Sequence, residues 1–265
     1  MTVAPTGEQA VKVKAACQQL LQEKALTIRE VAKVLGLLTS SLLRMLYGPL
    51  HYRSLEMDKT QALKSNQGNF DSIMALSREA VADLQWWINS VEETSKPVKQ
   101  REIQITMTTD ASKKGWGCSV EGTSTGGSWT HHEAQYHINY LETKADFLAL
   151  QAFSHELSGK CVSILVDNTT AVLCINQMGT CHSKEINSIV RQIWECCISH
   201  SIWITVFLER KIQLHTANQG NKEGKLNGLL ILRSSTTCLQ GFQSNLILIY
   251  LRHRRYSYHF VNKLF

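Results

Sequence analysis

Apolar and polar residues alternate with two different periods along the chain. In about the first ninety residues, apolar side chains recur close to every 3.6 positions, the period of an amphipathic helix. The helices predicted in this way cover 9–24, the run after Thr27 that Gly48 and Pro49 close, 52–66, and the segment that Ser77 caps. Thr27 and Glu30 also have the spacing of a capping box, which strengthens the second of these helices.

After the charged, proline-containing stretch 92–100, the pattern becomes strand-like. The segments predicted to be strands are 103–109, 115–121, 126–130, 161–166 and 202–207, and those predicted to be helices are 140–157, 169–178 and 185–199. Three strands joined by short turns, followed by alternating helices and strands, predict an α/β fold. We expect a mixed five-stranded sheet flanked by helices.

These patterns divide the chain into three regions. Residues 1–98 are predicted to be a small helical segment. Its boundary is placed within the stretch 92–100, after which the pattern changes from helical to strand-like. Residues 99–220 are predicted to form the α/β domain. Residues 221–265 contain short apolar runs without a regular period and a basic cluster. This part is expected to be a degenerate or partly disordered tail.

Composition narrows the class of protein. Hydrophobic residues make up 43% of the 265 residues and charged residues 19%, enough for a buried core. The net charge of +6 permits a polyanionic partner without requiring one. We see no signal peptide and no apolar run long enough to span a bilayer, so no membrane partner is expected. The eight cysteines form no Cys-x-x-Cys pair, and reduced thiols are expected in an intracellular protein of the cytoplasm or nucleus.

Three carboxylates fall at the ends of predicted elements. Asp110 ends the first strand of the α/β domain, Asp167 ends the strand 161–166, and Glu142 lies in the first turn of the helix between them. If the two strands are parallel neighbours, their carboxyl ends meet at one edge of the sheet. Three converging carboxylates cannot all stay charged without a cation, and oxygen ligands suit Mg²⁺ or Mn²⁺.

Each of these residues also has an ordinary structural explanation. Asp is common in turns and at strand ends, and Asp167 with Asn168 is a plausible cap of the next helix. A glutamate in the first turn of a helix is favoured by the helix dipole. Spacing alone leaves both interpretations open.

Longer motifs around these residues carry a resemblance. The stretches TTDASKKGWG, HINYLETKA, VDNTTAVLCINQMGT and HSKEINSIVRQIWE, within 106–198, resemble the ribonuclease H domain of retrotransposon reverse transcriptases, in particular of DIRS-type elements. The stretches LYGPLHYRSLE, DKTQALK and LSREAVADLQWWI, within 27–91, are similar to the thumb- or connection-like region that precedes that domain. The resemblance implies a ribonuclease H-like fold and makes Asp110, Glu142 and Asp167 the catalytic, metal-holding acids.

The resemblance further implies two Mg²⁺ or Mn²⁺ ions and hydrolysis of the RNA strand of an RNA–DNA hybrid. The remainder of a reverse transcriptase polyprotein is a further expected partner. Asn139, Thr169 and Asn176 are candidate substrate contacts, with capping or a solvated helix face as their ordinary roles. An integrase on a related fold is a rival interpretation, but it does not need Glu142 in the motif NYLETKA.

The sequence departs from the family pattern in two ways. No YxDD-like polymerase motif is present, so polymerase activity is not expected. The stretch FLERKIQLHTANQGN has Leu208 where the family has a histidine and Asn218 where it has a fourth catalytic acid. A neutral amide binds a cation less strongly than a carboxylate does, so the second metal site is expected to be weakened. A catalytically inactive nucleic-acid-binding relic is therefore the alternative function.

Overall fold

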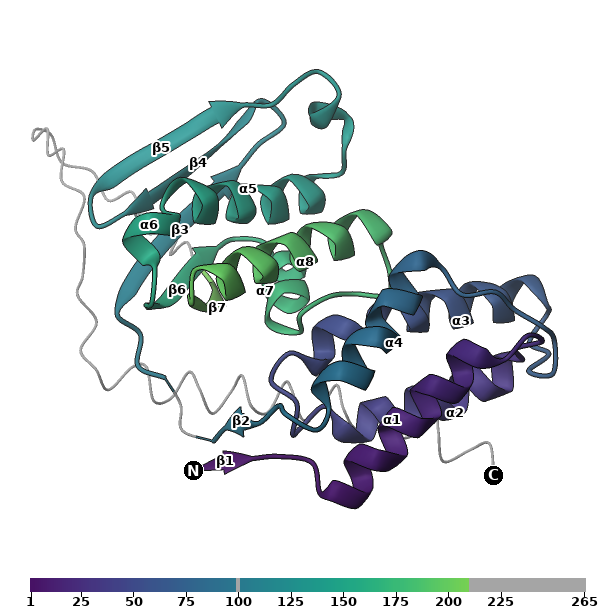
Figure 1. The fold of residues 1–265 in the computed structure, drawn as a ribbon. Coiled ribbons are helices and arrows are strands. Elements are labelled where there is room, and N and C mark those ends of the chain that lie inside the picture. The colour runs from purple at the N-terminus through teal and green to yellow at the C-terminus, as the bar shows by residue number, and fades with distance from the viewer. Residues whose placement is uncertain (99–100, 210–265) are drawn as a thin grey trace, which may run out of the picture. The chain divides into compact units, whose positions relative to one another are not determined.

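Helices fill the first part of the chain, as the sequence predicts. The computed structural model describes residues 1–98 and 101–209 (Figure 1). The predicted tail 221–265 and the candidate ligand Asn218 lie outside these described residues. The helices of the first region are α1 (Gly7–Gln22), α2 (Ile28–Ser41), the 3-10 helix η1 (Gly48–His51), α3 (Arg53–Ser65) and α4 (Arg78–Ser90).

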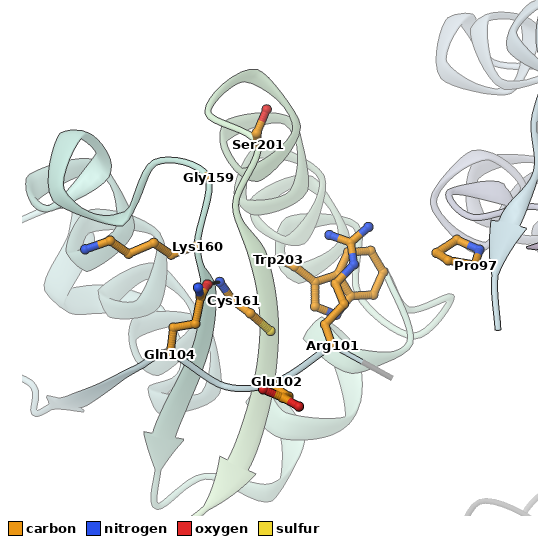
Figure 2. A pocket seen from close by; sticks show the side chains of 9 residues that line it. All are labelled: Pro97, Arg101, Glu102, Gln104, Gly159, Lys160, Cys161, Ser201 and Trp203. Atoms are coloured by element: carbon orange, nitrogen blue, oxygen red, sulfur yellow. Dashed lines mark hydrogen bonds between the residues drawn. The ribbon is translucent and has the colours of Figure 1, made fainter. Parts of the chain in front are cut away.

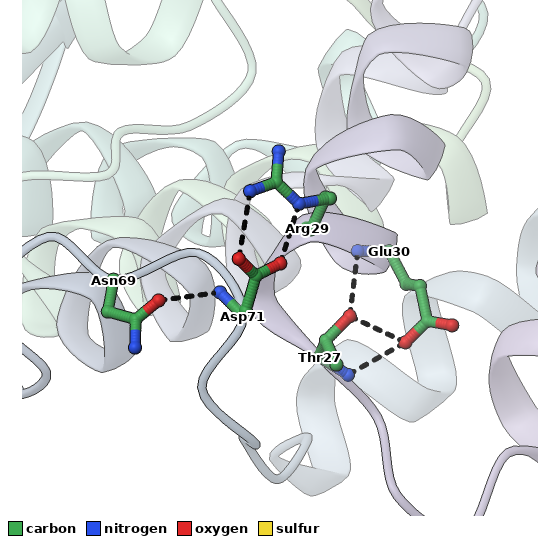
Figure 3. Close-up of polar contacts among 5 residues, drawn as sticks. All are labelled: Thr27, Arg29, Glu30, Asn69 and Asp71. Atoms are coloured by element: carbon green, nitrogen blue, oxygen red, sulfur yellow. Dashed lines mark hydrogen bonds and ion pairs between the residues drawn. The ribbon is translucent and has the colours of Figure 1, made fainter.

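The start of α2 is fixed by the predicted capping box. The Thr27 side chain accepts a hydrogen bond from the backbone N–H of Glu30, and the Glu30 carboxylate accepts one from the backbone N–H of Thr27 (Figure 3). Two of the otherwise unpaired backbone donors at the helix start are satisfied in this way. In the same view, Arg29 forms a two-pronged ion pair with Asp71, whose backbone N–H donates to Asn69.

The helix α2 ends earlier than the sequence pattern predicts. It stops at Ser41 rather than at the Gly48-Pro49 pair. The hydroxyls of Thr39 and Ser41 donate to the carbonyls of Leu35 and Leu37 one turn earlier. Such side-chain bonds compete with the backbone ladder and weaken a helix where they cluster, so the chain turns there despite its apolar residues.

The helices of this region share one apolar core. Its side chains include Leu38, Leu84 and Trp87, all fully buried. The indole N–H of Trp87 donates to the carbonyl of His51, which satisfies the polar atom of a buried aromatic ring. The short strand β1 (Thr2–Val3) pairs with β2 (Lys96–Pro97), inside the stretch predicted to be a linker. No helix in the described part of the chain is both long and apolar enough to cross a membrane.

A five-stranded mixed sheet forms the second region, which confirms the predicted fold class. Its strands are β3 (Ile105–Ala111), β4 (Gly115–Val120), β5 (Thr123–Ser128), β6 (Cys161–Val166) and β7 (Trp203–Leu208). They are arranged in the order β5-β4-β3-β6-β7. β4 pairs with β3 and with β5 in antiparallel fashion, whereas β6 and β7 run parallel to β3. This meander of three strands, extended by two parallel ones, agrees with the ribonuclease H-like fold that the resemblance implies.

Helices flank the sheet. They are α5 (Ile138–Ala152), α6 (Ser154–Leu157), α7 (Thr169–Asn176) and α8 (Lys184–Ser199), with a 3-10 turn at Glu133–Gln135. The predicted helix 140–157 is thus two helices that break at Phe153. α5 packs on β3 and β4, and α8 lies alongside α5 (Figure 1). The core between them and the sheet includes the fully buried Met107, Leu150 and Ile164.

Candidate metal centre

Asp110 and Asp167 lie next to each other at the carboxyl ends of two neighbouring strands of the sheet. β3 and β6 are parallel, and their last register pair joins Thr108 to Leu165. Continuing that register by two residues brings Asp110 opposite Asp167, which directly follows β6. Both side chains are exposed. The prediction that these strands are parallel neighbours is therefore confirmed, and the carboxyl ends of the two strands present one acid each.

Glu142 reaches the same point from α5. The helix begins at Ile138, two residues earlier than predicted, so Glu142 lies in its second turn rather than its first. The helix-dipole explanation for this glutamate is therefore weaker than the sequence indicates, because the effect fades beyond the first turn. One oxygen each of Asp110, Glu142 and Asp167 lies within 4.8 Å of the other two. Glu142 is buried, with 5% of its surface exposed.

This group of oxygens fits a divalent cation. Carboxylates that approach so closely repel one another unless a proton or a cation intervenes. Burial of Glu142 makes the repulsion more costly, because low dielectric strengthens it. Hard oxygen ligands of this kind match Mg²⁺ or Mn²⁺, and two exposed acids above a buried one leave the site open on the solvent side. The chemistry of the donor set is thus compatible with a metal.

The predicted cap of the helix after Asp167 is confirmed, and Asn168 provides it. The N-cap of α7 is Asn168, whose side-chain oxygen accepts hydrogen bonds from the backbone N–H groups of Thr170 and Ala171. Asp167 is the residue before the cap, at the junction of β6 and α7. The capping function in this turn therefore belongs to the neighbouring asparagine.

Asn139 connects α5 to this turn. Its side-chain oxygen accepts a hydrogen bond from the Asn168 amide at 3.0 Å, and its own amide donates to the Thr170 hydroxyl at 3.2 Å. Both ends of the Asn139 side chain are engaged with the turn that follows Asp167. It is predicted to contact substrate, and the structure gives it a role in orienting the turn as well.

Two further residues predicted to contact substrate lie on α7. Thr169 is exposed at the start of the helix, two residues after Asp167. Asn176 is at the other end, where its amide donates to the carbonyl of Val206 and accepts from the backbone N–H of the same residue. The two bonds satisfy the backbone C=O and N–H of Val206 on the edge strand β7, as a further strand paired with β7 would. Substrate contact by either residue stays a prediction.

Sequence reasoning missed a buried polar pair behind the three carboxylates. The hydroxyl of Thr109 donates to the carboxyl of Asp146 at 2.6 Å, and both residues are buried. The pKa of Asp146 is raised to about 8. Burial is the main cause, the Thr109 hydrogen bond opposes it, and the nearby Glu142 charge adds to the rise. An aspartate among the apolar residues of ADFLAL, one turn after Glu142, was the available signal.

A glycine lies beside Asp110 on the neighbouring strand. Asp110 pairs with Gly117 across β3 and β4, and directly opposed residues project to the same face of a sheet. A methyl group added at Gly117 would meet only one atom, the Thr125 carbonyl oxygen at 3.9 Å. Packing therefore does not require glycine there, and its absence of a side chain leaves the surface next to Asp110 open.

A pocket lies at the opposite end of this sheet. A pocket of about 520 Å³ is lined by residues that include Gln104, Cys161 and Trp203, at the beginnings of the parallel strands (Figure 2). Arg101 lies over the Trp203 ring, 4.5 Å from its centroid, and Pro97 is set apart from the others. The three carboxylates are at the far ends of the same strands, so this pocket is not part of their site.

Comparisons with known proteins give only distant likenesses. No protein-family model matches the chain, and no curated protein matches it significantly. Similar solved structures include RNase H1 from the archaeon Halobacterium salinarum, 13% identical with a TM-score of 0.34 over 40% of this chain and 86% of that one. An N-terminal RNase H domain from Mycobacterium tuberculosis is 10% identical, with a TM-score of 0.30 over 42% of this chain and 86% of that one.

A viral protein is similar over a longer stretch. The foamy viral protease-reverse transcriptase, solved with an RNA/DNA hybrid, is 13% identical with a TM-score of 0.31. The match covers 84% of this chain but only 30% of the viral one. At this distance the likenesses do not bear on activity, and the fold class rests on the strand order of the sheet itself.

Proposed function

We propose that this chain carries a ribonuclease H-like domain of a retrotransposon reverse transcriptase, which hydrolyses the RNA strand of RNA–DNA hybrids. The observation that carries the proposal is the convergence of Asp110, Glu142 and Asp167, drawn from two adjacent parallel strands and a helix. Three carboxylates so close together cost electrostatic free energy, and a bound divalent cation would recover it. The DIRS-type origin and the reverse transcriptase origin of residues 1–98 belong to the same proposal and rest on the sequence motifs.

The three acids have different parts in the proposed site. Asp110 and Asp167 are exposed and would hold the cation on the solvent side, from which a phosphodiester approaches. The buried Glu142 would complete its coordination from the protein side. When bound, a pair of divalent cations activates a water molecule and stabilises the leaving oxygen of the phosphodiester. No side-chain nucleophile is required, which agrees with a site made of carboxylates.

The substrate side of the proposal depends on exposed groups near these acids. RNA is distinguished from DNA by its 2′-hydroxyls, which act as donors and acceptors. Thr169, exposed two residues after Asp167, is well placed among the predicted contacts, and Asn139 is close to the same turn. Gly117 leaves room beside Asp110 for a nucleic acid backbone. The net charge of +6 favours a polyanionic substrate.

The second candidate function is nucleic-acid binding without catalysis. The sequence favours it at one position, Asn218, where the resemblance implies a fourth acid. A neutral amide there would weaken the hold on a second ion, so we expect slow cleavage, faster with Mn²⁺ than with Mg²⁺. The substitution Asn218→Asp should increase the rate.

The test is cleavage of a hybrid whose RNA strand carries an end label, using the full chain with Mn²⁺ or Mg²⁺. We expect cleavage that is lost in Asp110→Asn and in Asp167→Asn. Glu195→Gln, which changes an exposed acid on α8, is the matched control and should cleave like the wild type. Binding of the hybrid without cleavage would favour the inactive relic. Equal cleavage by the wild type and both aspartate variants would refute the proposed site.

A further inference from the structure

Glu142 and Asp110 stand on two separate elements, and one buried hydrogen bond joins these elements next to both acids. Thr109 immediately precedes Asp110 on β3, and Asp146 follows Glu142 by one turn of α5. The Thr109 hydroxyl donates to Asp146 at 2.6 Å, between residues that are 37 positions apart. Asp146 is completely buried and Thr109 is 5% exposed. The bond is therefore shielded from water and fixed in geometry.

We propose that Asp146 is a positioning residue, which holds Glu142 at the distance from Asp110 that a divalent cation requires. This inference rests on the proposed metal site. Residues one turn apart on a helix lie on the same side, and a helical turn is stiff, so fixing Asp146 also fixes Glu142. Adjacent residues on a paired strand are equally stiff, so anchoring Thr109 anchors Asp110.

Stability alone does not explain this pair. The second carboxyl oxygen of Asp146 is buried and has no hydrogen-bond partner in the part of the chain that the structure describes. A buried polar atom without a partner costs free energy, and an apolar side chain of similar size avoids that cost. The neighbouring core of α5 is apolar, with Ala149 and Leu150 fully buried. An aspartate that is worse than leucine for packing therefore needs another reason to be there, and orientation of Glu142 supplies it.

Apolar packing cannot replace the hydrogen bond in this function. Contacts between α5 and β3 are non-directional and tolerate small shifts of the helix along the sheet. Metal coordination does not tolerate such shifts, because ligand distances vary by only a few tenths of an ångström. Residues that orient metal ligands typically change metal affinity by 10- to 100-fold when they are removed. The same range is expected here.

The test measures binding of Mn²⁺ to the full chain by electron paramagnetic resonance of the free ion, which does not depend on cleavage. Asp146→Leu and Thr109→Val remove the hydrogen bond and keep the branched shape of the side chain, and we expect each to weaken Mn²⁺ binding by about 10-fold or more. Asp146→Asn and Thr109→Ser keep an acceptor or a hydroxyl, and we expect Mn²⁺ affinity within about twofold of the wild type. Urea unfolding of each variant reports its stability separately.

The possible results are distinct. Wild-type Mn²⁺ affinity in folded Asp146→Leu and Thr109→Val would overturn the positioning role and leave the proposed function intact. Absence of Mn²⁺ binding by the wild type would overturn the metal site, and both proposals with it. If Asp146→Leu does not fold, the pair Thr109→Val and Thr109→Ser decides. Weakening in the first with recovery in the second supports the inference, and equal affinity in both contradicts it.

Discussion

The side chains of Asn139 and Asn168 are joined by a hydrogen bond of 3.0 Å, although 29 residues separate them in the sequence. The first belongs to the first turn of α5, and the second caps α7 directly after Asp167. A second hydrogen bond, from the Asn139 amide to the Thr170 hydroxyl, connects the same two elements. The Asn139 bonds connect α5, which carries Glu142, to the turn that carries Asp167. The Thr109–Asp146 bond connects α5 to β3, which carries Asp110.

Replacement of Asn139 by alanine should therefore weaken metal binding as well as stability. The change removes two partly buried hydrogen bonds, so we expect a loss of about 1–3 kcal/mol in the free energy of unfolding. It also releases the turn that carries Asp167, so Mn²⁺ affinity should fall several-fold. Gln151→Ala, at an exposed position of the same helix, is the control and should change neither quantity. Normal Mn²⁺ affinity with a raised KM for hybrid would instead assign Asn139 to substrate contact alone.

Asp146 should make stability depend on pH with a characteristic sign. Burial raises its pKa from 3.8 to about 8 in the folded state, so between these values the folded protein holds a proton that the unfolded chain has released. The free energy of unfolding should therefore fall as pH rises from about 4 to about 8, by at most about 1.4 kcal/mol per pH unit from this group. The comparison is urea unfolding of the wild type and Asp146→Asn from pH 5 to 8 in EDTA.

The difference between these two proteins isolates the contribution of Asp146. The amide does not titrate, so the stability of the wild type relative to Asp146→Asn should decline with pH. Glu142 is the charged group that adds to the shift, and it is present in both proteins. A relative stability that stays flat, or increases with pH, would mean that the Asp146 carboxyl is ionised inside the fold.

A partly buried ion pair between α4 and α8 should matter for stability. The Asp83 carboxylate, 1% exposed, lies 2.6 Å from the Arg191 guanidinium, which also donates to the Leu50 carbonyl. Arg191→Met would leave the buried Asp83 carboxylate with His51, 3.5 Å from the same oxygen, and its other oxygen has no hydrogen-bond partner among the described residues. We expect a cost of about 3–5 kcal/mol in urea unfolding. Asp83→Asn keeps an acceptor and should cost less. Equal losses for the two variants would show that packing, not charge, dominates.

Two paired glycines, Gly117 on β4 and Gly126 on the edge strand β5, should respond differently to the same substitution. A methyl group at Gly126 would lie 2.5 Å from the Trp116 carbonyl oxygen, whereas at Gly117 its nearest neighbour is 3.9 Å away. Gly126→Ala should therefore lower the free energy of unfolding by about 1–3 kcal/mol, and Gly117→Ala should not. A bulkier Gly117→Val should fold and yet reduce hybrid cleavage by covering the surface beside Asp110. Thermal melting and cleavage assays distinguish the two effects.

Local signals were sufficient for most of the fold. The caps at Thr27 and Ser77 marked helix starts, because a side-chain oxygen at these positions satisfies backbone donors whatever the rest of the chain does. The strand 161–166 was predicted with its observed bounds, since a short apolar run rich in β-branched residues has few alternatives. The sequence does not predict the early end of α2, because the bonds from Thr39 and Ser41 depend on the rotamers that these side chains adopt in the folded protein.

The sequence by itself determined the elements and the candidates Asp110, Glu142 and Asp167, because short-range patterns and motifs are written along the chain. Only the tertiary structure decided that these acids share one point, since that depends on the parallel pairing of β3 with β6 and on the packing of α5. The partnerships of Thr109 with Asp146 and of Asn139 with Asn168 were likewise invisible in the sequence. A hydrogen bond between distant residues is set by how the elements pack, and no local pattern records it.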